Sequence, residues 1–370
     1  MRKGFFGILV LAVAVTLSGC GQFFPPNTGC TTNCTTAGAN IYVGNSTAAS
    51  VSAFSISSSG ISSLSNSPYA LGISPSALAI TPANKFVYVA SLAGGIYVYT
   101  VGSNGALTIG NNGSAVVSGI SPTAIKVDVS GNWLLAVDPT PAAYVFAINT
   151  DGTVTSKGSV PLAANSSPNH LVIPPSNNFV YVSLGTVGVG ILSFNATTGV
   201  ITNNNQILAP KQAVDAIQGI DVNPTGTFLY AAETGINGVR VLAINATTGA
   251  LTEAAGSPYT VGIGPSGVMI DLTGSYLYVT NRTSNNISAF LALSSGALTA
   301  VAGSPFATGT NPVDLAEDNT KTYIAVVNAG GNPDLQVFKL DTTTPGALDT
   351  FKSTATDKDP ANALAVVAAH

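Results

Sequence analysis

The sequence predicts an all-β protein, a seven-bladed β-propeller with four antiparallel strands in each blade. Three observations support this fold class: a unit of 46 to 49 residues recurs seven times, each unit holds several short apolar runs, and turns containing Gly or Asn separate these runs. A helical repeat protein is disfavoured, because no long stretch has the 3.6-residue period of an amphipathic helix.

The first twenty residues have the pattern of an export signal. Arg2 and Lys3 precede an apolar run over residues 5–17, which is short for a membrane span. The run leads into LSGC, which resembles the bacterial lipobox, in which the cysteine is lipidated after cleavage. We therefore expect a signal peptide over 1–20, a lipid anchor at Cys20, and a place in the cell envelope, at the outer membrane or facing the periplasm. The alternative is a plain secretory signal with an incidental cysteine.

Residues 21–39 are interpreted as a flexible tether. They contain Cys30 and Cys34 in the stretch GCTTNC, outside any strand pattern. In an oxidising compartment a small disulfide between them is the simpler interpretation. A metal site is not expected, because no His or further Cys lies nearby.

The seven units begin to align at an aromatic run, as in NIYVGN, KFVYVAS and SYLYVTN. The matching positions are Tyr42, Tyr88, Leu135, Tyr181, Tyr230, Tyr278 and Ile324. Each unit also holds a run such as PSALAI, a run such as GIYVYTV, and an LT segment after a glycine turn. Four short strands per unit follow, apolar on both faces because each sheet is packed between two others.

The ends of the chain predict how the ring closes. The first aromatic run, Ile41–Asn45, has no inner strand before it, and the chain ends in DPANALAVVAAH. We expect this C-terminal segment to supply the missing inner strand, which gives a propeller over residues 40–370. We expect the protein to be a monomer.

Charge limits the function. Only 8% of the residues are charged and the net charge is −4, so no basic surface for nucleic acid is expected. Metalloprotease, nucleophile-elbow and calcium-loop motifs are absent from the sequence, and GTVGVG joins two strands without opening a helix. We expect no cofactor.

A candidate site emerges where three consecutive units depart from the others. The column at the start of the inner strands reads Ala77, Ala124, His170, Gly219, Gly267, Asp314 and Asn362. The column where the aromatic strands end reads Asn45, Ser91, Asp138, Leu184, Glu233, Asn281 and Val327. His170, Glu233 and Arg282 are scarce residue types from three consecutive units, and antiparallel pairing places them at one face near the axis.

These three residues suit hydrolysis, with a base to activate water and a guanidinium to stabilise the negative charge that forms on a carbonyl oxygen. They suit equally a solvated histidine beside a structural ion pair. We expect polar neighbours in the same columns to contact a ligand. These neighbours are Asn169, Gln218, Asp138 and Asn281.

LYVTN, with its seven-fold recurrence, resembles the YVTN repeat. The stretches SPNHLVIPPSNNFVYVSLG and YLYVTNRTSNNISAF are similar to the lactonase-type propellers, the 6-phosphogluconolactonase and muconate-cycloisomerase-like proteins. The resemblance covers residues 40–370 and implies site roles for His170, Glu233 and Arg282. Gln218 and Gly219 stand where the family usually has an arginine and a histidine, which removes part of an anion clamp.

Two functional hypotheses follow. The first is a lipid-anchored lactonase in the cell envelope, which hydrolyses a sugar-derived or other lactone. In it His170 or Glu233 activates water and Arg282 polarises the carbonyl. The second is a non-catalytic propeller that binds a small ligand or a protein at the envelope.

Overall fold

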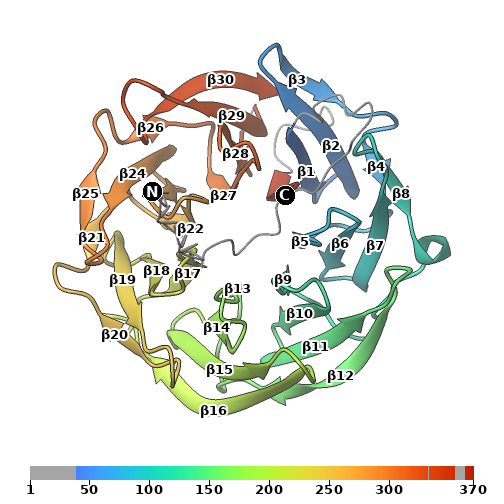
Figure 1. Cartoon of the computed structure of the whole chain (residues 1–370), viewed down its shortest axis with the longest axis horizontal. Helices are drawn as coiled ribbons and strands as arrows, with labels where there is room; N and C mark the ends of the chain where they lie inside the picture. Colours follow the sequence, from blue (N-terminus) through green and yellow to red (C-terminus); the bar gives the residue numbers. More distant parts are fainter. Residues whose placement is uncertain (1–38, 332, 355–362) are drawn as a thin grey trace, which may run out of the picture. The chain divides into compact units, whose positions relative to one another are not determined.

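The computed structural model describes residues 39–331, 333–354 and 363–370, which form seven sheets of antiparallel strands. The innermost strands surround the centre of a ring and the fourth strands form its perimeter (Figure 1). The predicted fold class, a seven-bladed β-propeller, is confirmed. No described helix is long and apolar enough to cross a membrane. The predicted signal peptide, Cys20, Cys30 and Cys34 lie outside the described residues.

Each of blades 1 to 4 has four strands in order from the axis outwards. Blade 1 consists of β31 (Ala363–Ala368), β1 (Ala39–Asn45), β2 (Ser50–Ser57) and β3 (Gly60–Ser63). Blade 2 consists of β5 (Ala77–Ile80), β6 (Phe86–Ser91), β7 (Gly95–Val101) and β8 (Leu107–Ile109). Blade 3 consists of β9 (Ala124–Val127), β10 (Trp133–Asp138), β11 (Ala142–Ile148) and β12 (Val154–Pro161). Blade 4 consists of β13 (His170–Val172), β14 (Phe179–Ser183), β15 (Val189–Asn195) and β16 (Val200–Leu208).

Blades 5 to 7 continue the same order. Blade 5 consists of β17 (Ile217–Val222), β18 (Phe228–Glu233), β19 (Gly238–Ile244) and β20 (Leu251–Glu253). Blade 6 consists of β22 (Pro265–Ile270), β23 (Tyr276–Asn281), β24 (Asn286–Ala292) and β25 (Leu298–Ala300). Blade 7 consists of β27 (Pro312–Glu317), β28 (Tyr323–Asn328), β29 (Leu335–Leu340) and β30 (Leu348–Thr354). The short elements are β4 (Tyr69–Ala70), β21 (Tyr259–Thr260), β26 (Phe306–Ala307) and the 3-10 helix η1 (Asn111–Gly113).

The C-terminal strand closes the ring as the sequence predicts. β31 pairs antiparallel with β1, and Val43 lies opposite Val366. The register corrects one position of the inner column, because Gly44 pairs with Ala365. Ala365 therefore occupies this column in blade 1, whereas Asn362, the expected residue, lies outside the described residues.

Blade 7 requires a second correction. Pro312 pairs with Asn328 as Pro265 pairs with Asn281, so Asn328, not Val327, ends the second strand at the equivalent position. The expected alignment was displaced by one residue because Ala325, and not an aromatic residue, takes the place of the repeated tyrosine in this unit.

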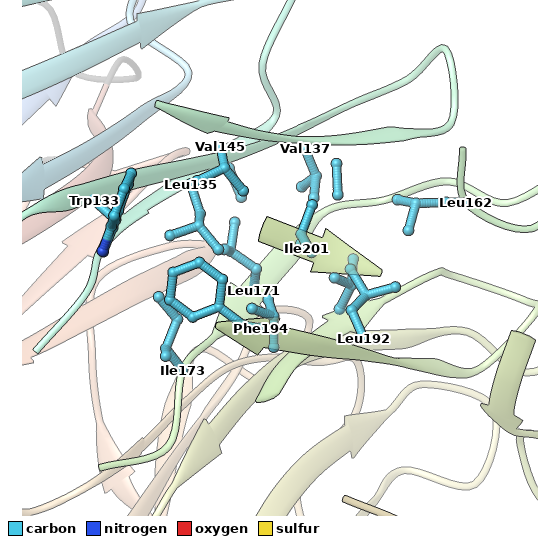
Figure 2. Packing of buried hydrophobic residues seen from close by; sticks show 14 of the residues in the cluster. Trp133, Leu135, Val137, Val145, Leu162, Leu171, Ile173, Leu192, Phe194 and Ile201 are labelled. Atoms are coloured by element: carbon cyan, nitrogen blue, oxygen red, sulfur yellow. The ribbon is translucent and has the colours of Figure 1, made fainter. Parts of the chain in front are cut away.

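The hydrophobic core lies between the blades. Seven clusters of buried side chains each join two neighbouring blades, and one of them joins blade 7 to blade 1. Figure 2 shows the cluster between blades 3 and 4, where Trp133 of β10, Leu171 of β13 and Phe194 of β15 meet. Each blade is apolar on both faces, because each face packs against a neighbouring blade.

The repeated tyrosine joins successive blades by hydrogen bonds. The hydroxyls donate to a turn carbonyl of the next blade in the pairs Tyr42–Gly105, Tyr88–Gly152, Tyr181–Gly249 and Tyr278–Gly346, over 2.9 to 3.1 Å. In blade 3 Leu135 replaces the tyrosine, and Trp133 Nε1 donates to the Ala196 carbonyl instead. The turn glycines adopt positive φ, for example 72° at Gly249, which explains why glycine recurs in the TTG turns.

Candidate active site

Antiparallel pairing brings the starts of the innermost strands and the ends of the second strands to one face, which we call the upper face. The pairs that define it in blades 4 to 6 are His170 with Ser183, Ile217 with Glu233, and Pro265 with Asn281. His170, Glu233 and Arg282 accordingly belong to the upper ends of three consecutive blades. Their environments nevertheless differ.

His170 is the first residue of β13, and one nitrogen of its imidazole makes no hydrogen bond to the described chain. Nδ1 is buried and has no hydrogen-bond partner among the described residues. Burial, aided by the charge of Lys126, lowers the pKa of His170 to about 4. The imidazole is therefore neutral at neutral pH, the state in which histidine can accept a proton from water.

Asn169 and Gln218, both predicted to contact ligand, contact each other beside His170. Asn169 Nδ2 lies 3.2 Å from Gln218 Oε1 and 3.4 Å from the carbonyl oxygen of Ile217. Asn169 Oδ1 accepts a hydrogen bond from Ser183. Blade 4 is thereby linked to blade 5 at the upper face, and Asn169 is fixed in orientation.

Glu233 is fully buried, and its charge partner is Arg240 of β19. Arg240 Nη1 lies 3.5 Å from Glu233 Oε2 and 2.9 Å from the carbonyl oxygen of Ala209. Glu233 Oε1 accepts a hydrogen bond from the backbone N–H of Lys211. The Arg240 guanidinium also lies 3.5 Å from Glu253, whose carboxylate is 2.5 Å from Lys211 Nζ.

A second buried carboxyl, that of Asp215, meets Glu233. Neither oxygen of Asp215 has a hydrogen-bond partner in the described chain, and its charge lies close enough to Glu233 to raise the pKa of that carboxyl. Burial is the largest cause that raises the pKa of Glu233. Asp215 is packed so closely on Gly235 that a Cβ there would lie 1.3 Å from Oδ1.

Arg282 is exposed and has a different partner. Its Nε donates to Asn311 Oδ1, and its backbone N–H donates to the Gly264 carbonyl over 2.8 Å. Arg282 thus belongs to the rim of the upper face, between blades 6 and 7, and the guanidinium paired with Glu233 is that of Arg240.

Asp138 and Asn281, the other two predicted ligand contacts, are buried and bonded within their own blades. Asp138 accepts hydrogen bonds from Thr140 at 2.7 Å and from the Tyr144 hydroxyl at 3.2 Å. Asn281 Nδ2 donates to Asn286 and Ser288. The Glu233–Arg240 pair occupies the same strand positions in blade 5, so this pair is the charged version of a repeated contact between second and third strands.

Four further charged residues lie on the innermost strands: Lys126 of β9, Asp221 of β17, and Asp314 and Glu317 of β27. Burial raises the pKa of Asp314 to about 6 and also raises that of Asp221, while Lys126 opposes both shifts. Among the residues that the structure describes, no group of three or more His, Cys, Asp or Glu side chains could hold a metal ion.

The sequence profile described as Lactonase, 7-bladed beta-propeller matches residues 33–305 and 255–365, which together span most of the chain. The chain belongs to this lactonase family. No curated protein matches the chain with significant sequence similarity.

Solved structures share the fold of this lactonase-family chain at low identity. A periplasmic gluconolactonase from Pseudomonas aeruginosa is 17% identical with a TM-score of 0.73, and the match covers 90% of this chain and 99% of that one. A Lactobacillus plantarum protein is 18% identical with a TM-score of 0.72, over 90% and 99% of the two chains. A Bacteroides uniformis protein, provisionally named a 6-phosphogluconolactonase, is 17% identical with a TM-score of 0.74, with the same coverage. At this identity the likeness shows the fold alone.

Arg240, Asp215 and Lys126 did not figure in the sequence-based site. Arg240 carried a usable signal, because it and Arg282 are the only arginines of the sequence after Arg2. Lys126 is the basic member of an inner-strand column that otherwise reads Ala79, Val172, Asp221, Met269, Ala316 and Val367. Asp215 lies in a loop outside the repeat, and alignment of the units gives no reason to select it.

Proposed function

We propose that this lactonase-family protein hydrolyses a lactone at the upper end of its central channel, with His170 as general base. The observation that carries the proposal is the place of His170 at the upper end of an innermost strand, with an imidazole that is neutral at neutral pH and whose Nδ1 has no partner in the described chain. His170 would take a proton from water as the water oxygen attacks the lactone carbonyl. It would return the proton to the ring oxygen when the ester bond breaks.

Glu233 is better suited to hold the site together than to activate water. Its carboxyl already contacts Arg240, Asp215 and the N–H of Lys211, and no part of the residue is exposed. Arg282 on the rim is exposed and is available to a substrate through its remaining N–H groups. We assign it to substrate binding at the rim.

The test is hydrolysis of a panel of γ- and δ-lactones by the full chain in detergent, followed by acid release. We expect His170→Gln to lower kcat/KM at least about a hundredfold, the usual range for loss of a general base. His370→Gln, a change at the only other histidine, should leave the rate unchanged. Equal rates in both variants, or no turnover of any lactone, would reject the proposal.

A non-catalytic binding propeller is the second candidate. The Asn169–Gln218 contact and the internal bonds of Asp138 and Asn281 favour it, because these groups serve the scaffold. In this case the lactone panel gives no turnover and His170→Gln changes only the affinity for a ligand.

We also propose that the protein is exported and anchored by a lipid at Cys20. The basic residues, the apolar run and LSGC support the proposal, and the Pseudomonas protein of the same fold is described as periplasmic. Radiolabelled palmitate should label the wild-type protein and not Cys20→Ser. Equal labelling of the two proteins would contradict a lipid at this position.

A further inference from the structure

A hydrolase needs a cation or a set of N–H donors where negative charge develops on the carbonyl oxygen. Two arginines follow the export signal. Arg240 is buried between Glu233 and Glu253, and Arg282 lies on the rim with its Nε bonded to Asn311. Neither guanidinium is therefore placed beside the imidazole of His170.

Lys126 lies on an innermost strand, β9, next to the axis of the propeller. It is exposed although it stands on an innermost strand between two buried residues, Ile125 and Val127. Its charge acts on His170, Asp221, Asp314 and His370, which belong to four different blades around the ring. These four groups surround the axis on which the innermost strands converge, and the exposed side chain of Lys126 starts from one of those strands.

The carboxyl groups whose pKa the Lys126 charge lowers, those of Asp221 and Asp314, accept hydrogen bonds from the backbone. Asp221 accepts from the N–H groups of Val222 and Ile270, and Asp314 accepts from those of Leu315 and Val366. In both cases the second donor belongs to the next blade, so these carboxyls link inner strands. Within the described chain, the ion pairs involve Lys211, Arg240 and their glutamates, and none involves Lys126.

We propose that Lys126 is a catalytic residue of this site: its ammonium binds the carbonyl oxygen of the lactone and stabilises the oxyanion that hydrolysis forms. The proposal rests on lactone hydrolysis with His170 as base. The strand registers support it, since Lys126 lies two residues further along β9 than Ala124, the counterpart of His170 on β13. The base therefore stands at the channel entrance and the cation lies deeper.

In the reaction, water gives a proton to His170 and its oxygen bonds to the carbonyl carbon. The π electrons of the carbonyl move to its oxygen, which Lys126 stabilises. The oxyanion then collapses, the bond to the ring oxygen breaks, and the imidazolium returns the proton to that oxygen. The product is a hydroxy acid, whose carboxyl proton is lost to solvent.

The first experiment compares kcat and KM of the full chain with those of Lys126→Met and Lys126→Arg. We expect Lys126→Met to lower kcat about a hundredfold or more, as for loss of one oxyanion donor, and Lys126→Arg to restore part of the rate. Lys157→Met, at an exposed lysine of β12 over the Trp133 ring, is the matched control and should retain the rate. An unchanged kcat in Lys126→Met, with an active parent, would overturn the role of Lys126 and leave lactone hydrolysis standing.

The second measurement does not depend on turnover. Removing the Lys126 charge should raise the pKa of His170, which NMR can follow in a His370→Gln background where one imidazole remains. An unchanged pKa would show that the ammonium does not reach the imidazole and would overturn the proposal. If the pKa rises but no lactone is turned over by the parent, both the function and the catalytic role of Lys126 fall, and Lys126 is a counter-charge to Asp221 and Asp314.

Discussion

Arg240 Nη1 lies 3.5 Å from Glu233 Oε2, and the two side chains are 4% and 0% exposed. At the equivalent positions blade 6 has two neutral side chains, Asn281 and Ser288. Blade 3 has one charged side chain, Asp138, which accepts a hydrogen bond from Tyr144. The Glu233–Arg240 pair is therefore a charged form of a contact between second and third strands that other blades make with neutral groups. Removal of the pair should lower the free energy of unfolding more than it changes the rate of any reaction.

Arg240→Met should lower the free energy of unfolding by about 3 to 5 kcal/mol, because it leaves the Glu233 and Asp215 carboxyls buried without a cation. Urea unfolding measures this loss. Arg282→Met is the matched control, and its exposed site should change stability by less than about 0.5 kcal/mol. Equal stability of the two variants would show that Arg240 does not neutralise the buried carboxyls.

The pH dependence of activity should report His170. Because its pKa is lowered to about 4, kcat/KM should stay high as the pH falls below 6.5 and decline only near pH 4. A pH–rate profile with the wild-type chain measures the midpoint. A midpoint near 6.5 would mean that the base is a solvated imidazole and not the buried one.

The same histidine should make stability depend on pH. The unfolded chain binds a proton near pH 6.5 and the folded chain only near pH 4, so wild type should lose stability relative to His170→Gln as the pH falls across this interval. Asp314, with its pKa raised to about 6, acts in the opposite direction in both proteins and cancels in the comparison. Parallel stability curves for the two proteins would contradict the shift.

Two buried tyrosines of blade 2, Tyr88 and Tyr99, offer a matched pair of hydroxyl deletions. Tyr88 donates to the Gly152 carbonyl at 3.0 Å, whereas the buried hydroxyl of Tyr99 has no partner in the described chain. Tyr88→Phe should cost about 1 kcal/mol, and Tyr99→Phe should be neutral or stabilising. Thermal unfolding of both variants gives the comparison. A larger loss from Tyr99→Phe would show that its hydroxyl has a partner after all.

The closing strand should be essential to cooperative unfolding. Removal of residues 363–370 exposes the hydrophobic cluster between blades 7 and 1, including Val43 and Val327. It also removes the hydrogen bond that the Val366 N–H donates to Asp314. We expect an open ring that binds a hydrophobic dye and unfolds at markedly lower urea concentration. Removal of residues 369–370 alone should cost far less, because the β1 pairing remains. Similar behaviour of the two truncations would contradict closure by β31.

The repeat of the sequence determined the number of blades, the four strands in each and the closure by the C-terminal strand, because every unit must bury both faces against like units. It also brought His170, Glu233 and Arg282 to one face, since antiparallel pairing fixes which strand ends meet. In blade 7 Ala325 stands where most units have tyrosine. The sequence therefore places the last residue of the second strand at Val327, one position before Asn328.

Only the tertiary structure decided which charges meet. Glu233 pairs with Arg240 of its own blade and lies near the buried Asp215 of a loop. The charge that lowers the pKa of His170 is that of Lys126, from the neighbouring blade. The physical reason is that the repeat fixes the positions of backbone segments along each blade. The partner of a charged side chain depends on rotamers, on loops outside the repeat and on the convergence of inner strands at the axis, and none of these is periodic in the sequence.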